Sequence, residues 1–293
     1  MKKLLCLLLA LCCVLPVAVA EEAATTEEVI EEVVGGEGQI NFIEHVDVTD
    51  LAIPEDEAPF IPEALRGETM NDELAVIGVD NRIDVNPSQY PYSAVSYLEV
   101  RGACGCEWTA SGFMVKPDWM MTAGHCLVCT THHEWAKNIT FYFGYRNKSN
   151  YLYRYTGPYT AWVNNDLMTY SSYDSYRDND YGYVHLDKRV GDTTGWFGIR
   201  YGMSDAEYAS EWFNVAGYRN GKIKTSVGAT ERMNNNSLYH YADTEPGYSG
   251  CPIFDNEYYA VAINSGYLLN NTANIGRRIT SDLYYDMKND GMQ

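Results

Sequence analysis

The sequence predicts an all-β fold built from many short strands, in a sandwich or a barrel. Runs of tyrosine and β-branched residues alternate with turn signals, which is typical of strands. Tyrosine is unusually frequent, with 25 among 293 residues. Only the end of the chain predicts a helix: Thr280 or Ser281 can cap it, and Leu283, Tyr284 and Met287 share one face at helical spacing.

The predicted strands fall into two successive sets. Lys116-Pro117-Asp118 is a turn signal inside the first set. The first set comprises residues 93–100, 110–115, 119–122, 139–145, 151–155, 159–163 and 182–186. The second set comprises residues 211–218, 222–227, 238–241, 252–254 and 258–265.

The first 20 residues have the features of a secretory signal. Lys2 and Lys3 precede an apolar run from residue 4 to residue 19, and Ala18-Val19-Ala20 offers a small-residue cleavage site. A spanning helix needs about 20 apolar residues, more than this run supplies. We therefore expect a secreted, extracellular protein with no membrane attachment once the signal is removed.

Residues 21–75 differ in composition from the rest of the chain. They hold 17 acidic residues and one basic residue, a net charge of −16, whereas residues 76–293 carry only −5. Low hydrophobicity with charge of one sign argues against an independent core. Directly behind a signal, this segment indicates an acidic pro-region, with a flexible spacer as the alternative. Residues 76–293 then form the globular domain, and without a basic patch we expect no nucleic-acid partner.

Five cysteines remain after the signal is removed. They are Cys104, Cys106, Cys126, Cys129 and Cys251. In an exported protein we expect two disulfides that tie residues 104 and 106 to residues 126 and 129, with the pairing open. A zinc site with His125, His132 or His133 is the alternative, disfavoured because the spacing matches no common zinc module. We therefore assign no metal ligand, and expect the fifth cysteine to be buried and unreactive.

Pro246-Gly247-Tyr248-Ser249-Gly250-Cys251-Pro252 is the candidate nucleophile segment. Glycines on both sides allow a tight turn that exposes the Ser249 hydroxyl and leaves room for a substrate carbonyl. The backbone N–H groups of Gly247 and Ser249 can then converge on an oxygen that becomes negative during reaction. An ordinary Gly/Pro/Ser loop is the alternative interpretation.

Two other segments supply a base and a carboxylate. A serine hydroxyl needs a base of near-neutral pKa, and His125 comes at the end of the apolar run 119–122, before a cysteine that can anchor the turn; His240 is the competing histidine. Asp180 directly precedes the strand at 182–186 and can orient the imidazole, with Asp178 as the alternative. The chain order His, Asp, Ser is the one found on double β-barrels.

Several ordered motifs between Val76 and Asn289 carry a family resemblance. They are Val76-Ile77-Gly78 with Asp80 and Arg82, Tyr90-Pro91-Tyr92-Ser93-Ala94, Thr122-Ala123-Gly124-His125-Cys126, Asp180-Tyr181-Gly182, Gly195-Trp196-Phe197-Gly198, Asp243-Thr244, Gly247-Tyr248-Ser249-Gly250 and Arg278-Ile279-Thr280. The chain resembles the V8-like glutamyl endopeptidases, secreted bacterial serine proteases of the trypsin type. The resemblance implies two six-stranded antiparallel β-barrels (the chymotrypsin-like fold), with the site between them. By resemblance, His125, Asp180 and Ser249 form the catalytic triad of a serine endopeptidase that acts on protein or peptide substrates. This chemistry needs no cofactor, and we expect a monomer.

The resemblance also implies activation and a specificity pocket. An activating protease cuts near Ala75–Val76, and the new amine of Val76 joins Thr244 and a histidine in recognising an acidic side chain. At the histidine position this chain has Asn264, which carries no positive charge. Preference for an acidic residue before the cleaved bond is therefore an open expectation. Cys251 is a second departure, because a serine usually follows the Ser-Gly pair in this family.

Two other functions remain as alternatives. A catalytically inactive binding module or adhesin on the same scaffold would be expected to lose a member of the triad, and this chain has all three. A lipase or esterase is disfavoured because Gly250 directly follows the serine, which breaks the Gly-x-Ser-x-Gly pattern of those enzymes.

Overall fold

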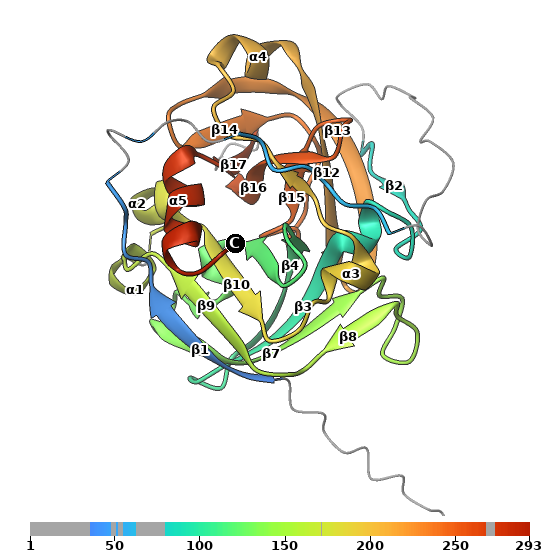
Figure 1. Cartoon of the computed structure of the whole chain (residues 1–293), viewed down its shortest axis with the longest axis vertical. Coiled ribbons are helices and arrows are strands. Elements are labelled where there is room, and N and C mark those ends of the chain that lie inside the picture. The colour runs from blue at the N-terminus through green and yellow to red at the C-terminus, as the bar shows by residue number, and fades with distance from the viewer. Residues whose placement is uncertain (1–35, 48–50, 52–54, 63–79, 171, 268–272) are drawn as a thin grey trace, which may run out of the picture. The chain divides into compact units, whose positions relative to one another are not determined.

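Two closed β-sheets dominate the described part of the protein, and its longest helix lies at the C-terminus (Figure 1). A computed structural model of the chain describes residues 36–47, 51, 55–62, 80–170, 172–267 and 273–293. Within these residues the all-β, two-barrel architecture expected from the sequence is confirmed. The proposed signal at 1–20 and the proposed cut at 75–76 lie outside the described residues.

The first barrel is a ring of seven strands within the described residues. In their order around the ring these are β1 (Gly36–Phe42), β9 (Tyr159–Val163), β10 (Gly182–Leu186), β5 (Trp119–Thr122), β4 (Glu107–Met114), β3 (Val95–Gly102) and β7 (Glu134–Phe143). The ring closes where β1 meets β7, and β6 (Val128–Cys129) and β8 (Tyr153–Tyr155) extend β7. Because β1 runs parallel to β9, this barrel is mixed rather than fully antiparallel.

The strand beyond the expected six comes from the acidic segment of residues 21–75 (the acidic leader). β1 lies between β9 and β7, and Ile43 continues the pairing with a backbone bond to Val163 of 3.0 Å. Farther along, the Phe60 ring stacks on Trp196 with centroids 4.3 Å apart. The leader is too polar for a core of its own, but an added strand needs only neighbours that complete its backbone hydrogen bonds. Its described residues therefore pack on the barrels, which its composition did not predict.

The second barrel is a ring of six antiparallel strands within the described residues. They are β16 (Tyr259–Tyr267), β15 (Pro252–Phe254), β12 (Trp212–Arg219), β13 (Lys222–Met233), β14 (Ser237–His240) and β17 (Asn274–Arg278), and the ring closes between β16 and β17. Two short strands extend it, β2 (Ile83–Asp84) beside β13 and β11 (Gly198–Ile199) beside β16. The sequence analysis missed β17 because its residues, Asn-Ile-Gly-Arg-Arg, lack the alternation of a strand.

Helices are short except at the end of the chain. They are α1 (Asp166–Thr169), α2 (Tyr173–Tyr176), α3 (Gly191–Thr194), α4 (Asp205–Ser210) and α5 (Ser281–Asn289), with 3-10 turns at η2 (Tyr92–Ala94), η3 (Gly124–Cys126) and η4 (Arg177–Asn179). α5 begins after Thr280 and buries Leu283, Tyr284 and Met287, as its spacing predicted. None of the described helices has the length and apolar composition needed to cross a membrane.

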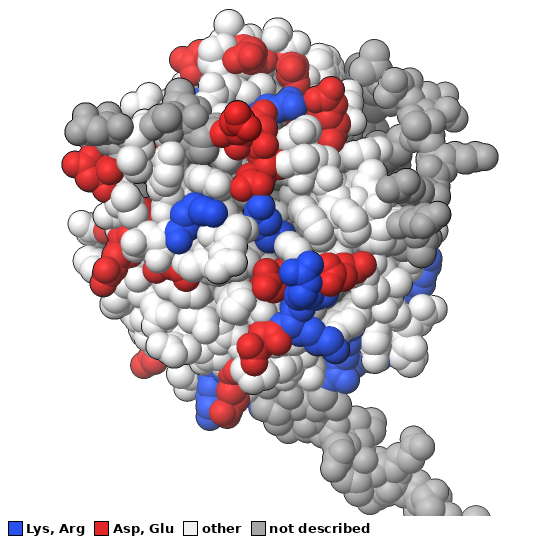
Figure 2. Space-filling view, viewed as in Figure 1, with Lys and Arg blue, Asp and Glu red and all other residues white. Residues whose placement is uncertain are grey.

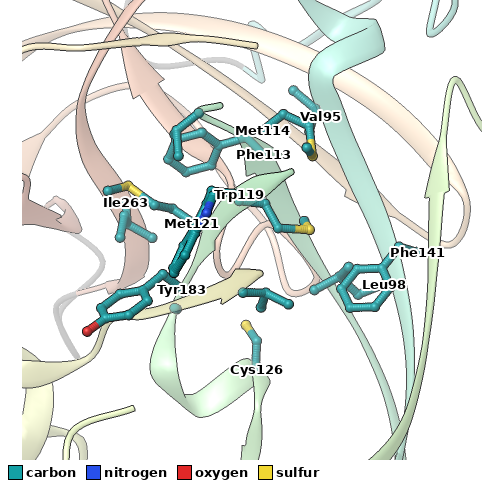
Figure 3. Close-up of a cluster of buried hydrophobic side chains, with 14 of the residues drawn as sticks. Val95, Leu98, Phe113, Met114, Trp119, Met121, Cys126, Phe141, Tyr183 and Ile263 are labelled. Atoms are coloured by element: carbon teal, nitrogen blue, oxygen red, sulfur yellow. The ribbon is translucent and has the colours of Figure 1, made fainter. Parts of the chain in front are cut away.

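A buried apolar cluster holds the barrels together next to η3. Figure 3 shows Phe113, Trp119 and Tyr183 of the first barrel close to Ile263 of the second, with Cys126 extending toward them from its turn. The Trp119 ring also stacks on Trp162, with centroids 5.4 Å apart. Burial of such rings is the main stabilising term for a barrel interior. Because Cys126 is packed in this cluster, the backbone of the preceding residue, His125, is held in a fixed position.

Charges are unevenly distributed over the face shown in Figure 2. Acidic residues gather over α4, and the basic residues below them are interspersed with acidic ones. Arg200 is an example, because it contacts Asp56, Asp255 and Glu257 at 3.1, 2.5 and 2.9 Å. Arg200 is therefore neutralised by the acidic residues around it.

Candidate active site

The turn η3 fixes the backbone of His125. Two backbone bonds close it, from Cys126 to Ala123 (3.0 Å) and from Leu127 to Gly124 (2.9 Å). Position 124 must be glycine, because a Cβ there would lie 2.9 Å from the backbone oxygen of Tyr181. Cys126 and Leu127 are fully buried and anchor the turn. The His125 side chain keeps 25% of its surface exposed, so the ring is rigidly placed yet accessible.

Asp180 holds the imidazole through two contacts. It is fully buried between η4 and β10. Its Oδ1 accepts the backbone N–H of His125 at 2.8 Å, and its Oδ2 lies 2.7 Å from Nδ1 of the ring. A carboxylate only accepts hydrogen bonds, so Nδ1 carries the proton and Nε2 is left as an acceptor. The competing carboxylate, Asp178, accepts instead from the Ser237 hydroxyl at 2.7 Å.

A serine from the second barrel completes the surroundings of the carboxylate. The Ser265 hydroxyl, on β16, donates to Oδ2 of Asp180 at 2.5 Å. Hydrogen bonds to an ionised acceptor are roughly twice as strong as neutral ones. Ser265 was missed by the sequence analysis, because a serine inside a strand gives no local signal of such a contact. It links the two barrels at the candidate base.

The pKa of His125 reflects two opposing effects. Burial lowers it, because a charged ring is poorly solvated there, and the Asp180 carboxylate raises it. The net effect is a His125 pKa well above its ordinary value of 6.5. The ring is therefore a stronger base than a histidine in water.

Ser249 lies on the turn before β15, beside the segment that leads to His125. A Cβ at Gly250 would lie 2.1 Å from Oγ1 of Thr122 and 2.2 Å from the Ser111 oxygen, so this backbone packs directly on the first barrel. The Ser111 N–H also donates to the Ser249 carbonyl at 2.8 Å. No hydrogen bond joins the Ser249 hydroxyl to His125 among the described residues; in unliganded enzymes this bond is often long.

The backbone around Ser249 leaves two amides free. Gly247 has φ +107° and Gly250 has φ +84°, conformations that favour glycine. Tyr248, between the candidate donors, bonds to the Glu245 carbonyl at 3.0 Å. Within the described residues the N–H groups of Gly247 and Ser249 have no acceptor. Both predicted oxyanion donors are therefore available to a ligand oxygen.

The residues of the expected specificity pocket are only partly described. Val76 lies outside the described residues, and Thr244 is half-buried. Asn264 is buried beside the nucleophile turn. Its side-chain N–H donates to the Tyr248 carbonyl at 3.2 Å, and its backbone carbonyl accepts from the Gly250 N–H at 2.7 Å. Its side-chain oxygen has no partner within the described part of the chain.

His240, the competing histidine, lies beside the Asn264 side chain, whereas Asp180 holds His125. It is fully buried on β14, and neither ring nitrogen makes a hydrogen bond within the described residues. Burial lowers the pKa of His240 to about 4, although the neighbouring amide of Asn264 acts in the opposite direction. The sequence analysis weighed His240 only as a competing base. With a pKa of about 4 the imidazole is neutral at pH 7, and it lies beside Asn264 without a hydrogen-bond partner in the described part of the chain.

The predicted disulfides are not found, because all five described cysteines are free thiols. Cys126, one of the expected partners, is a free thiol buried in the apolar cluster of Figure 3. Cys251 is fully buried as expected, and burial raises the pKa of its thiol well above the ordinary value, which keeps it protonated. The other three cysteines lie together at the tip of the β3–β4 hairpin and the end of β6.

Comparison with known proteins agrees with this geometry. The chain is 28% identical over 231 residues to a glutamyl endopeptidase of Bacillus licheniformis, covering 73% of this chain and 68% of the relative. It is also 28% identical over 230 residues to a Bacillus subtilis protein named extracellular metalloprotease, covering 73% and 69%.

Solved structures share the fold. A Glu endopeptidase in complex with MPD matches with a TM-score of 0.62 at 22% identity, over 75% of this chain and all of that one. The protease Anisep from Arthrobacter nicotinovorans matches with a TM-score of 0.56 at 16% identity, over 70% and 97%. The family model described as Trypsin matches residues 79–286. The resemblance inferred from the motifs is thus confirmed, and the chain belongs to the trypsin family.

Proposed function

We propose that this protein is a serine endopeptidase that hydrolyses peptide bonds with His125, Asp180 and Ser249. The observation that carries the proposal is the chain of contacts from Ser265 through buried Asp180 to His125, beside the glycine-flanked Ser249. An inactive binding module would have no need of a buried carboxylate that holds an exposed imidazole in one tautomer. The glutamyl endopeptidase relative supports the same reaction class.

The geometry supports the following steps. Ser249 Oγ attacks the substrate carbonyl carbon while Nε2 of His125 removes the hydroxyl proton, and Asp180 stabilises the resulting imidazolium. The carbonyl oxygen becomes negative and binds the amides of Gly247 and Ser249, each worth about 10²–10³ in turnover. His125 then protonates the leaving amine, and water hydrolyses the acyl-enzyme by the reverse path.

For specificity, we propose a preference for acidic residues before the cleaved bond. His240 supports it: a neutral imidazole with two unpaired nitrogens beside Asn264 can donate to a carboxylate and gain a proton from solvent. The resemblance places the acid-recognising histidine at position 264, where this chain has asparagine. His240 would therefore supply from β14 the charge that position 264 lacks, together with Thr244.

Two measurements test these proposals. A fluorophosphonate should label the wild type but not Ser249→Ala; equal labelling of both would refute the role of Ser249. Cleavage sites in a peptide mixture should fall after Glu or Asp. His240→Gln should reduce cleavage after acidic residues selectively, whereas His185→Gln, a half-exposed histidine on β10, should leave the profile unchanged. Cuts after Glu or Asp that persist in His240→Gln would refute the role of His240, and a wild-type profile without such cuts would refute the acidic preference; neither result would refute the hydrolase.

We also propose a secreted zymogen that leaves the cell by its signal and is cut near Ala75–Val76 by an activating protease to give an active monomer. The name of the Bacillus subtilis relative supports export. Because β1 is hydrogen-bonded into the first barrel, the leader should remain bound after the cut. N-terminal sequencing of the secreted protein should yield two sequences from a single peak of monomer mass. A single sequence beginning upstream of residue 76 would contradict the cut.

A further inference from the structure

Three thiols and one imidazole converge on one point of the first barrel. Cys104 and Cys106 lie at the tip of the β3–β4 hairpin, Cys129 ends β6, and His132 lies in the turn before β7. Their ligand atoms all lie within 4.8 Å of one another. His132 Nδ1 is 3.4 Å from the sulfur of Cys106 and 3.3 Å from that of Cys129. Half-buried sulfurs around an exposed histidine place this cluster at the surface.

The spacing of these atoms matches the first coordination sphere of zinc. Tetrahedral Zn–S and Zn–N bonds of about 2.3 and about 2.0 Å separate sulfur from nitrogen by about 3.5 Å, close to the two observed distances. A disulfide would instead bring two sulfurs to about 2.0 Å, and all three cysteines are free. Thiolates together with an imidazole are ligands that select zinc over hard cations such as magnesium or calcium. We propose that Cys104, Cys106, Cys129 and His132 bind one zinc ion.

The backbone already holds the ligands in place. Gly105 turns the hairpin with φ +84°, and its N–H bonds to the Gly102 carbonyl at 3.0 Å. Gly102 bonds to the Cys106 carbonyl at 2.8 Å, and Ala103 to the Trp135 carbonyl on β7 at 2.9 Å. The hairpin tip is thus tied to the strand that follows His132. A site prepared by the backbone loses little further entropy when the ion binds.

Four protein ligands make this a closed site, which is the structural type rather than the catalytic one. Its place in the fold indicates what it stabilises. Cys129 follows His125 by four residues, and the Trp108 indole, two residues beyond Cys106, donates to the Cys126 carbonyl at 3.0 Å. The ion would therefore fasten the β3–β4 hairpin to β6 behind the turn η3. Coordination would also keep the three thiols reduced outside the cell.

The first test measures metal in the full chain purified without chelators. Wild type and Ser249→Ala should each contain one zinc per chain, and the second protein separates zinc binding from the proposed catalysis. Cys129→Ser and His132→Ala should reduce the zinc content at least tenfold. Cys251→Ala and His185→Ala are the matched controls and should retain it. Wild type that holds no zinc after exposure to the ion, or ligand variants that keep it, would overturn the proposal.

The second test needs no variant, so misfolding of a substituted chain cannot confuse it. In the native wild type, an alkylating reagent should modify none of the three thiols until a chelator is added, and then all three, as followed by mass. The chelator should also lower Tm, and added zinc should restore it. Three thiols that react without chelator, or a disulfide among Cys104, Cys106 and Cys129, would overturn the site while leaving the endopeptidase proposal intact.

Discussion

Replacing Asp180 with asparagine tests the candidate site most directly, because the side chain keeps its shape but loses an acceptor. The carboxylate accepts from the His125 backbone, from the His125 ring and from the Ser265 hydroxyl. An amide has one accepting oxygen and one NH₂ group that only donates. If the oxygen keeps the backbone bond, the NH₂ faces Nδ1 at 2.7 Å. The ring must then carry its proton on Nε2, where it cannot accept one from Ser249.

The size of the effect follows from these bonds. We expect kcat to fall about 10⁴-fold, as for Ser–His–Asp triads in general. That is about 5.4 kcal/mol at 1.36 kcal/mol per tenfold. The two bonds to Oδ2, from the His125 ring and from the Ser265 hydroxyl, are lost; at about 1.5–3 kcal/mol each for an ionised acceptor, together about 3–6 kcal/mol, they are sufficient to account for this loss. The variant should still fold, because no volume changes.

The pH dependence gives a second readout of the same substitution. His125 must be neutral to act as a base, so activity falls as the pH drops through its pKa. In the wild type Asp180 raises that pKa, and the acidic limb of kcat/KM should lie above pH 6.5. In Asp180→Asn the residual activity should show this limb at lower pH. Activity within tenfold of wild type, with an unmoved limb, would refute the reasoning.

The remaining predictions concern neighbouring positions. Ser265→Ala removes one hydrogen bond to the buried carboxylate, worth about 1.5–3 kcal/mol, and should lower kcat about tenfold or more with little change in KM; an unchanged kcat would show that Asp180 needs no such support. Gly250→Ala adds about 1–2 kcal/mol of backbone strain and a contact of 2.2 Å between the new Cβ and the Ser111 oxygen. The free energy of unfolding, measured in urea, should therefore fall by more than the roughly 1–2 kcal/mol that the strain alone would cost. Gly291→Ala is its control, since φ is also positive there but nothing lies within 4 Å; equal losses in both variants would remove the contact argument.

Local sequence patterns determined most of the strands, the C-terminal helix and the candidate triad residues. Strand and helix periodicities are properties of adjacent residues, so they are readable along the chain. The glycines around Ser249 could also be interpreted from the sequence, because each is required by the backbone conformation of its own turn. The position of Asp180 two residues before β10 likewise favoured it over Asp178, and in the structure Oδ2 of Asp180 lies 2.7 Å from Nδ1 of His125.

Only the tertiary structure decided which distant residues meet. Ser265 and Asp180 are 85 positions apart and come into contact because the two barrels pack together. His132 joins the cysteines because the β3–β4 hairpin reaches β6, and the polar leader becomes a strand because β9 and β7 offer it unpaired backbone groups. Such contacts leave no local signal, since each partner is an ordinary residue in its own segment. They are set by the packing of the barrels, which is the sum of many distant interactions.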